Sequence, residues 1–343
     1  MNSERGKNSR MIKVTALTSG SHNPSSRFRV RQFIGPLSNF GIQVTEHYPL
    51  VNKYHTKRVL PLALVARLPG VLASRSSRVT WLERELVPGR RTLEGLAGTR
   101  RLLDVDDAIW LNAPNSSESL ARVCHGVIAG NEFIADYYRK FDVRVWTIPT
   151  SLDTARWRPG PPRPGNDWII GWTGTSSNLG YLYRIEEAVA EFLSQNKQTQ
   201  LLVVCDRRPV LKKLPSESWR FVRWSAEKEI RLVQEMDVGL MPLPDTEWAR
   251  GKCALKMIMY LAVGIPAIVS PVGVSKSLLG QSDVGLAARN PNEWFDALRR
   301  LFDDRRAAAR LGAAGRKLVE EQFSITVNAP KLAAAIREIA ASG

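Results

Sequence analysis

One apolar stretch constrains the fold of this chain more than any other feature of its 343 residues: ALKMIMYLAVGIPAIVSPVG, residues 254–273. The part from Cys253 to Val263 is apolar nearly all round, which predicts a helix packed against a sheet. Gly264 stands where helices end in a left-handed turn, and Pro266 prevents the helix from continuing. The following AIVSPVG predicts a buried parallel strand that ends in a sharp turn. Because ligands of such sheets bind beyond the carboxyl ends of the strands, this stretch also predicts a ligand site.

Strand-like and helix-like segments alternate along the chain, and a segment rich in Pro and Gly, RPGPPRPGND at residues 158–167, divides the alternation in two. Such a segment excludes both a helix and a central strand, so we interpret it as a linker. The alternation is typical of doubly wound parallel sheets. The sequence predicts an α/β protein with two Rossmann-like domains, residues 1–160 and 161–325, and a C-terminal helix, residues 326–343, packed back on the first domain. Predicted strands lie in MIKVTALTSG, GIQVTEHYPL, VTWLEREL, RRLLDVDDAIWL, GVIAGN, VRVWTIPT, WIIGWTG, QLLVVCD, DVGLMPL and AIVSPVG.

Composition and cysteine usage predict a folded protein of a reducing compartment. Hydrophobic residues make up 44% of the sequence and charged residues 24%, unlike disordered or collagen-like chains. Cys124, Cys205 and Cys253 are far apart and form neither a C-x-x-C pair nor a zinc-binding pattern. No apolar signal core follows the basic start MNSERGKNSRM, and no run of about 18 uncharged apolar residues occurs. We therefore expect a cytoplasmic protein without a spanning helix.

The formal net charge of +16 indicates an anionic partner, for which nucleic acid, a membrane face and a phosphorylated substrate are the candidates. Residues 1–165 carry 25 Lys and Arg against 13 Asp and Glu, a surplus of +12, so the excess lies in the first half. Neither a helix-turn-helix pattern nor base-stacking aromatic motifs accompany the charge. We therefore expect no nucleic-acid partner.

Residues 52–80 combine the aliphatic run VLPLALVARLPGVL with flanking cations. This combination suits contact with an anionic lipid surface, and burial between domains is the alternative. Pro61 and Pro69 predict that the segment is broken into short helices. Together with the basic first half, the segment predicts a peripheral protein on the inner face of the plasma membrane. The cations are Lys53, Lys57, Arg58, Arg67, Arg75 and Arg78.

Two lysines, Lys252 and Lys256, lie one helical turn apart where the apolar helix is predicted to begin. The N-terminus of a helix carries unpaired N–H groups, and two ammonium groups beside it make an anion site. The alternative is that both lysines are solvated surface charges. The apolar surroundings of Lys256 favour the site.

Three segments of the second half occur in an order that resembles the donor domain of GT-B-fold glycosyltransferases of the retaining family 4: WIIGWTGTSSNLGYL, VRWSAEKEIRLVQEMDVGLMPL and RGKCALKMIMYLAVGIPAIVSPVG. Upstream, VTWLERELVPGRRTLEGL and LLDVDDAIWL look like the N-terminal domain of a bacterial subgroup with a D-x-D-D-A-x-W motif. The resemblance implies transfer of a sugar, with retention, from a nucleotide-diphosphate sugar in a cleft between the domains. It implies a glycan or lipid-linked acceptor in cell-surface polysaccharide or glycolipid synthesis, no obligatory metal, and no cofactor besides the sugar donor.

The same resemblance places the donor diphosphate at the turn after the first strand of the second domain. The matching residues are Gly174, Thr175, Ser176, Ser177 and Asn178. Small residues let backbone N–H groups approach phosphate oxygens, although a plain strand-to-helix turn would look alike. The turn lacks the G-x-G-x-x-G pattern of nicotinamide-binding proteins.

The chain departs from the family at two positions. The family commonly has two glutamates eight residues apart before the helix-ending glycine, the second of which holds the ribose, whereas Gly251 and Met259 stand there in this chain. Asp245 and Glu247 in the preceding loop are candidate substitutes. The alternative for each is a solvent-facing loop acid.

The first half carries a carboxylate cluster in DVDD, with Asp104, Asp106 and Asp107 at the end of a predicted strand. Strand alternation predicts Asp104 and Asp106 on one face and Asp107 on the other. Clustered carboxylates repel unless they are paired, an arrangement that is common at functional sites. We expect Asp106 or Asp107 to contact the acceptor hydroxyl, where it either accepts the proton or orients the group. The alternative is that one of them caps the next helix.

The first loop, SGSHNPSSRFRVRQF, brings Arg27, Arg29 and Arg31 close together. Arginines in this arrangement predict a clamp for a phosphate of the donor or of a lipid-diphosphate acceptor. On a helix Arg29 points away from the other two, so at least one of the three is expected to be structural. The other predicted acceptor contacts are His22 and Glu85, and Glu83 and Glu85 are expected to pair with these arginines.

Two further functions from different classes stay open at this point. The altered glutamate positions are compatible with a catalytically impaired relative that acts as a carbohydrate-binding or scaffolding protein. Nucleic-acid binding is the other. Loss of nucleotide-sugar turnover in Lys256→Ala would exclude the first, whereas steep salt dependence of duplex binding would favour the second.

Overall fold

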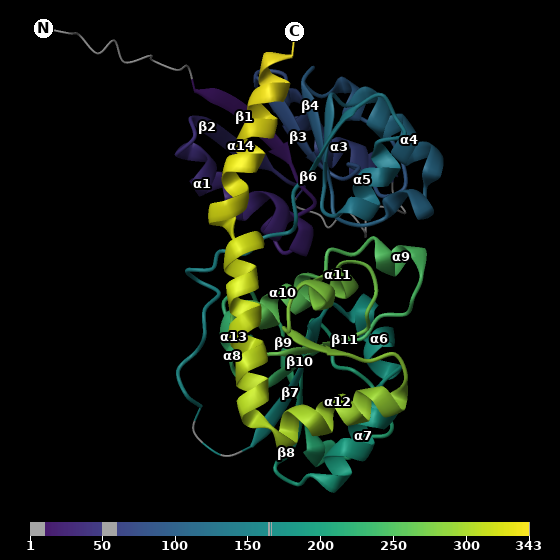
Figure 1. Ribbon diagram of the computed structural model, residues 1–343. Coiled ribbons are helices and arrows are strands. Elements are labelled where there is room, and N and C mark those ends of the chain that lie inside the picture. Colours follow the sequence, from purple (N-terminus) through teal and green to yellow (C-terminus); the bar gives the residue numbers. More distant parts are fainter. Residues whose placement is uncertain (1–10, 50–59, 164, 166, 343) are drawn as a thin grey trace, which may run out of the picture. The chain divides into compact units, whose positions relative to one another are not determined.

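The computed structural model describes residues 11–49, 60–163, 165 and 167–342 and divides the chain into two compact units (Figure 1). Unit 1 comprises Met1–Ser151 and Ile325–Gly343, and unit 2 comprises Leu152–Ser324. Each unit contains a twisted, six-stranded parallel sheet with helical connections. The fold class expected from the alternating sequence pattern is confirmed.

The sheet of unit 1 has the strand order β2-β1-β3-β4-β5-β6, and all its strand pairs are parallel. The strand order reverses after β2, so that β3 pairs with the other side of β1; this reversal is a feature of doubly wound sheets and places several strand ends beside one another. The strands are β1 Ile12–Leu17, β2 Ile42–His47, β3 Val79–Glu83, β4 Arg101–Val105, β5 Gly126–Ala129 and β6 Arg144–Thr147.

The helices of unit 1 include one from the far end of the sequence. Leu332, Ile336 and Ile339 of α14, drawn in yellow in Figure 1, share a buried cluster with Val14 and Trp81 of the sheet, so the C-terminal helix is part of this core. The helical segments are η1 Ser26–Val30, η2 Arg31–Phe33, α1 Ile34–Ser38, α3 Leu60–Ser74, η3 Glu94–Leu96, η4 Ile109–Leu111, α4 Pro114–Val123, α5 Glu132–Tyr138 and α14 Ile325–Ala341.

The prediction that Pro61 and Pro69 break the aliphatic segment into short helices is wrong, because α3 is one continuous helix. Pro61 lies in the first turn, where a backbone N–H has no helical partner anyway. Pro69 has no N–H, so the helix lacks one backbone hydrogen bond there. The next residue, Gly70, packs so tightly on the sheet that a β-carbon would lie 3.0 Å from both Leu17 and His47, and this packing outweighs the lost bond. The cations at positions 53, 57 and 58 lie outside the described residues.

The sheet of unit 2 has the order β12-β11-β10-β7-β8-β9, again with parallel pairs. Its strands are β7 Trp168–Gly174, β8 Thr199–Cys205, β9 Trp219–Arg223, β10 Val238–Met241, β11 Ala267–Val269 and β12 Gly285–Ala287. Its helical segments are η5 Ser176–Asn178, α6 Leu179–Tyr183, α7 Glu186–Gln195, η6 Ser216–Ser218, α8 Glu229–Gln234, α9 Glu247–Arg250, α10 Leu255–Ala262, α11 Val274–Gln281, α12 Pro291–Asp303 and α13 Arg305–Gln322.

The stretch that opened the sequence argument folds as predicted into α10, a left-handed turn and the buried strand β11. Gly264 has φ +78°, and the N–H groups of Gly264 and Ile265 donate to the carbonyls of Leu261 and Tyr260. These two hydrogen bonds satisfy carbonyl groups at the end of the helix, and the turn that makes them requires a residue that tolerates positive φ. A glycine at this position therefore fixes where α10 stops and β11 begins.

The proline-rich segment contains neither a helix nor a strand in its described residues, yet it belongs to unit 2. Gln234 Nε2 donates to the carbonyl of Arg158, and Arg163 binds the Asp237 carboxylate at 2.6 Å. The division between the units therefore precedes the segment, at Ser151 and Leu152. Residues 152–160, which the sequence pattern assigns to the first domain, fall in unit 2.

Among the described residues, no helix has the length and apolar character needed to cross a bilayer.

Candidate functional site

The turn after β7 brings Gly174 against Lys256 at the start of α10. A β-carbon built on Gly174 would lie 2.9 Å from Lys256 Cε and 2.8 Å from the buried ring of Trp172. The Lys256 ammonium lies 5.6 Å from the centroid of the same ring, within the range of a cation–π contact. A β-carbon at this position would force the Trp172 ring or the Lys256 side chain to shift, so the glycine lets a cation stand beside the backbone of the turn.

The turn itself is held by hydrogen bonds among its own side chains. Thr175 Oγ1 lies 2.9 Å from Ser177 Oγ and accepts a bond from Asn178 Nδ2 at 2.8 Å. The short helix η5 begins within the turn, and its residues are not buried. The five residues expected from the sequence thus form one compact turn at the carboxyl end of β7.

Asp206, which the sequence argument did not identify, binds this turn from the end of β8. Its carboxylate accepts the Ser176 N–H at 2.6 Å and the Ser176 hydroxyl at 2.8 Å. Partial burial acts to raise the pKa of Asp206, but the bonds from Ser176 outweigh it and leave the pKa below its ordinary value. A carboxylate therefore already occupies an anion position of the turn, which shows that the Ser176 amide can bind a negatively charged oxygen.

Lys252 and Lys256 flank the beginning of α10, whose N-cap residue Ala254 has the left-handed φ of +51°. The Lys252 ammonium lies over the ring of Trp248, 5.4 Å from its centroid. Each lysine is therefore associated with a different tryptophan, and the Gly174 contact involves Lys256.

The two acids considered as substitutes for the missing glutamates have local roles. Asp245 pairs with Arg250 at 2.8 Å, and this ion pair lowers the pKa of the exposed Asp245 carboxyl. Glu247 is the first residue of α9, whose amide at Ala249 is capped by Thr246 Oγ1. Met259 is 4% exposed and belongs to the buried face of α10.

In unit 1 two of the three carboxylates of DVDD, those of Asp106 and Asp107, converge on one cation, Arg84, at the ends of β3 and β4. Arg84 Nε donates to Asp106 Oδ1 at 2.5 Å and Arg84 Nη2 to Asp107 Oδ2 at 2.7 Å. Ser25 completes the group: its hydroxyl donates to Asp106 Oδ2 at 2.6 Å and accepts from Arg84 Nη2 at 3.0 Å. The expectation that Asp106 and Asp107 lie on opposite faces is wrong, because β4 ends at Val105 and strand alternation ends with it.

Arg84 adopts a left-handed backbone with φ +56°, although it is not a glycine. Its N–H still donates to the Asp104 carbonyl at 2.9 Å, so the ladder between β3 and β4 extends to this residue. The sequence offered no signal for this conformation, since Arg84 stands between two glutamates in LEREL and looks like an ordinary strand cation.

Arg29 and Asp104 form a buried ion pair below this group, with a distance of 2.8 Å and side chains that are 3% and 2% exposed. Arg29 also donates to the Ile148 carbonyl, and Trp81 Nε1 donates to Asp104 at 3.3 Å. Burial raises the pKa of Asp104 to about 6, against the lowering effect of Arg29. Arg29 is therefore a structural cation of the unit 1 core, and its expected place in a phosphate clamp is wrong.

Arg31 is likewise occupied by an acid, because it makes a two-bond contact with Glu46 at 2.6 and 2.8 Å. Arg27 stacks over the ring of Phe28 at 4.8 Å. His22 is exposed in the loop before η1. The three arginines of the first loop thus have separate surroundings instead of forming one clamp.

The expected pairing of Glu83 and Glu85 with these arginines is also wrong. Glu83 accepts bonds from the backbone and hydroxyl of Ser19, both at 2.7 Å, and from the Ser26 hydroxyl. Glu85 accepts the Gly89 N–H at 3.1 Å. Short serine contacts to Glu83 and an internal loop contact to Glu85 take the place of ion pairs.

Within the described parts of the chain, no three His, Cys, Asp or Glu side chains are grouped so that they could hold a metal ion.

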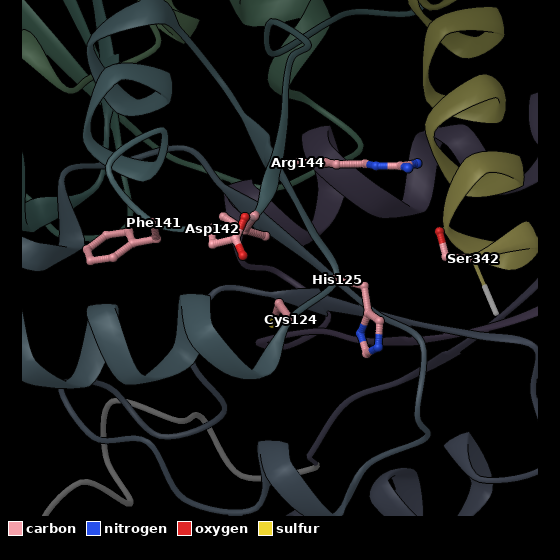
Figure 2. Close-up of a pocket in the computed structure, with 7 residues that line it drawn as sticks. Cys124, His125, Phe141, Asp142, Arg144 and Ser342 are labelled. Atoms are coloured by element: carbon pink, nitrogen blue, oxygen red, sulfur yellow. The ribbon is translucent and has the colours of Figure 1, made fainter.

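Unit 1 has a hollow of about 500 Å³, whose lining residues are drawn in Figure 2 and which lies at the opposite edge of the sheet from the carboxylate group. Cys124 and His125 precede β5 and Arg144 begins β6, so the hollow lies at the amino ends of these strands. Ligands of open parallel sheets bind at the carboxyl ends, and for this reason the hollow is not a candidate site. Its lining residues are Cys124, His125, Phe141, Asp142, Val143, Arg144 and Ser342.

Comparison with known proteins finds one matching family model. Residues 168–304 match the family model described as Glycosyl transferases group 1, and the matched range lies within unit 2. No curated protein matches the sequence.

Several solved structures share the fold at low sequence identity. The sucrose-phosphate synthase of Thermosynechococcus elongatus has a TM-score of 0.71 at 15% identity, covering 96% of this chain and 100% of its own. Anabaena HepE in complex with UDP and glucose has a TM-score of 0.65 at 12% identity, covering 95% of this chain and 99% of its own. A glycosyltransferase from Rickettsia africae has a TM-score of 0.64 at 12% identity, covering 97% and 99%.

The fold is that of the GT-B glycosyltransferases, with two Rossmann-like domains of six parallel strands each. Unit 2 carries a domain of the glycosyl transferases group 1 type.

Proposed function

We propose that the protein transfers a sugar from a nucleoside-diphosphate sugar to a hydroxyl acceptor. The observation that carries this proposal is the contact between Gly174 and Lys256 inside the group 1 domain. It places a cation and a glycine turn at the carboxyl end of β7, where parallel sheets bind ligands. A solved structure of the same fold, Anabaena HepE, contains UDP and glucose.

In this proposal unit 2 offsets the charge of the leaving diphosphate. The Lys256 ammonium and the amides of the turn at 174–178 face the phosphates, and a phosphate oxygen replaces Asp206 as the acceptor of the Ser176 N–H. The lysine and the amides then neutralise the diphosphate charge, which a metal ion neutralises at other sites. We therefore propose that the reaction needs no metal or further cofactor. Transfer proceeds with retention, as in the family that the sequence resembles.

Unit 1 supplies the acceptor side. We propose that Asp106 or Asp107 accepts a hydrogen bond from the acceptor hydroxyl and orients it, while the donor phosphate takes the proton. Both carboxylates lie beyond the end of β4, at the ligand-binding edge of their sheet. The acceptor class is a glycan or a lipid-linked glycan of cell-surface polysaccharide or glycolipid synthesis.

The place of action in this proposal is the cytoplasmic face of the membrane, on which α3 lies with one apolar face. Leu62, Val65, Leu68 and Leu72 are 39–61% exposed and follow helical spacing, so they form one outward stripe, which we call the α3 stripe. Between Glu46 and Glu83 the sequence has six Lys and Arg and no acid. Apolar side chains with only cations around them suit an anionic bilayer.

A thermal-shift screen against UDP-, GDP-, ADP- and TDP-sugars, followed by an assay of acceptor-dependent nucleotide release, tests the function. Stabilisation by one donor together with release is the expected result. Stabilisation without release would instead support the second candidate, a sugar-binding or scaffolding relative. The specific observation in favour of that candidate is the buried Met259, which stands where the family has its ribose-binding glutamate.

A further inference from the structure

Arg84 combines an unfavourable backbone with an elaborate set of partners. Its φ of +56° belongs to the left-handed region, in which residues with a β-carbon are strained and which glycine adopts without cost. Strain of this kind persists only where the surroundings determine the conformation, and it collects at functional sites. The surroundings of Arg84 include three partners of its guanidinium, namely Asp106, Asp107 and Ser25.

The left-handed turn lets Arg84 reach Asp106 and Asp107 at the same time. Its donors contact Asp106 at 2.5 Å, Asp107 at 2.7 Å and the Ser25 hydroxyl at 3.0 Å. The two side chains of the acids remain 14% and 18% exposed, whereas that of Arg84 is 11% exposed. The guanidinium therefore holds both carboxylates while part of each carboxylate side chain stays exposed to solvent.

Stability alone does not explain this arrangement. Arg29 and Asp104, the acid just before Asp106 in the DVDD segment, form a more deeply buried ion pair, and neither residue is left-handed. The Arg84 group instead lies at the partly open ends of β3 and β4 and fixes the direction of two adjacent carboxylates. Such fixing is what an acceptor hydroxyl needs, because misplacement by about 1 Å costs about 100-fold in rate.

We propose that Arg84 is the positioning residue of the acceptor site, and that it holds Asp106 and Asp107 as a directed carboxylate pair for the acceptor hydroxyl. This inference rests on the proposed transferase function and adds a residue to it. Arg84 itself touches neither donor nor acceptor; it acts through the two acids.

Loss of Arg84 changes the proton affinity of Asp106. At present Arg84, Ser25 and Arg29 outweigh the effect of burial and hold the pKa of Asp106 below its ordinary value. Without the guanidinium, Asp106 loses the strongest charge that lowers its pKa, while burial and the nearby Asp104 carboxyl still oppose its charged form. Repulsion and burial then favour protonation, so Asp106 loses its charge at higher pH.

The experiment compares the wild type with Arg84→Gly and Arg84→Lys. Glycine relieves the backbone strain, so this variant folds even though the ion pairs are lost, whereas lysine keeps one charge without the forked donors. Arg122→Ala is the matched control, because Arg122 is an exposed arginine of the same unit paired with Glu118. We expect kcat for transfer to fall by about 100-fold in Arg84→Gly, with donor Kd changed by less than about twofold.

The pH profile separates positioning from a general structural loss. We expect the acid limb of transfer activity to move up by about one pH unit or more in Arg84→Gly and by less in Arg84→Lys, with no shift in Arg122→Ala. A fall in kcat at every pH without movement of the limb would overturn the role of Arg84. So would unchanged kcat in both Arg84 variants. If the wild type itself transfers no sugar from any donor, the proposed function fails first, and this role fails with it.

Discussion

Gly174 and Lys256 touch: the Cα of the glycine leaves no room for a β-carbon, which would come within 2.9 Å of the lysine Cε. The two residues belong to β7 and α10, elements that are far apart in the sequence. A cation is thereby fixed next to the backbone of a turn in which a carboxylate, that of Asp206, is already bound. The first two predictions follow from this contact.

Replacement of the lysine should weaken the binding of nucleoside diphosphates. Removal of one charged hydrogen bond, of the order of 1.5–3 kcal/mol, predicts that Lys256→Ala raises the Kd about 10- to 100-fold by calorimetry. Lys317→Ala is the control, since Lys317 is 76% exposed in the same unit and makes only a long contact with Glu321. Equal affinity of both variants and the wild type would remove Lys256 from the site.

Replacement of the glycine should disturb the same place by crowding. Gly174→Ala puts a methyl group against Trp172 and Lys256, and overpacking of this kind costs about 1–3 kcal/mol. We expect a lower Tm and weaker donor binding. Gly180→Ala serves as the control, because a β-carbon at Gly180 in α6 has no atom within 4 Å and alanine favours a helix. Similar effects of the two changes would contradict the crowding.

Asp104 should make the free energy of unfolding depend on pH with a defined sign. Burial raises its pKa to about 6 from the ordinary 3.8, so between these values the folded state binds a proton that the unfolded state releases. Its contribution to stability is therefore fully present below about pH 4 and is lost as the pH rises through about 6. In Asp104→Asn this titration is absent. In urea unfolding, the free energy of unfolding of the wild type relative to Asp104→Asn should therefore fall between pH 4.5 and pH 7; a relative stability that does not change with pH would contradict the raised pKa.

The α3 stripe should control binding to anionic vesicles. In Leu62→Gln/Val65→Gln two side chains that are 50% and 61% exposed lose their apolar character, so the Tm should hardly change while sedimentation with vesicles of about 30% anionic lipid falls severalfold. Val210→Gln is the control, as Val210 is the comparably exposed apolar residue of unit 2 at 68%. Equal recovery with neutral vesicles at low salt would contradict the membrane proposal.

Much of the fold could be predicted from local pattern. The alternation of strands and helices gave two parallel sheets, and the order apolar helix, Gly264, Pro266, aliphatic strand located α10 and β11 closely. These predictions succeed because helix stops and buried strands are specified by neighbouring residues. The turn at Gly174 could be located for the same reason.

The partners within the sites could not be predicted, because they depend on contacts between distant segments. Asp206 meets Ser176 from another strand, Arg29 reaches Asp104 from another element, and Arg84 takes a conformation for which glycine is the usual residue. The continuity of α3 through Pro69 has a similar cause, since packing of Gly70 on β1 and β2 outweighs a local rule. Spacing alone reports none of these contacts.

The return of α14 to the unit 1 core makes the two units unequal as fragments. Unit 2 is one uninterrupted piece of chain, so a gene for residues 152–324 encodes all of its core and offers a minimal fragment on which the proposed nucleotide binding can be tested. Unit 1 is assembled from two segments that lie on either side of unit 2 in the sequence. During synthesis its core therefore waits for α14 to leave the ribosome, and a stop codon before Ile325 would damage the unit that is made first.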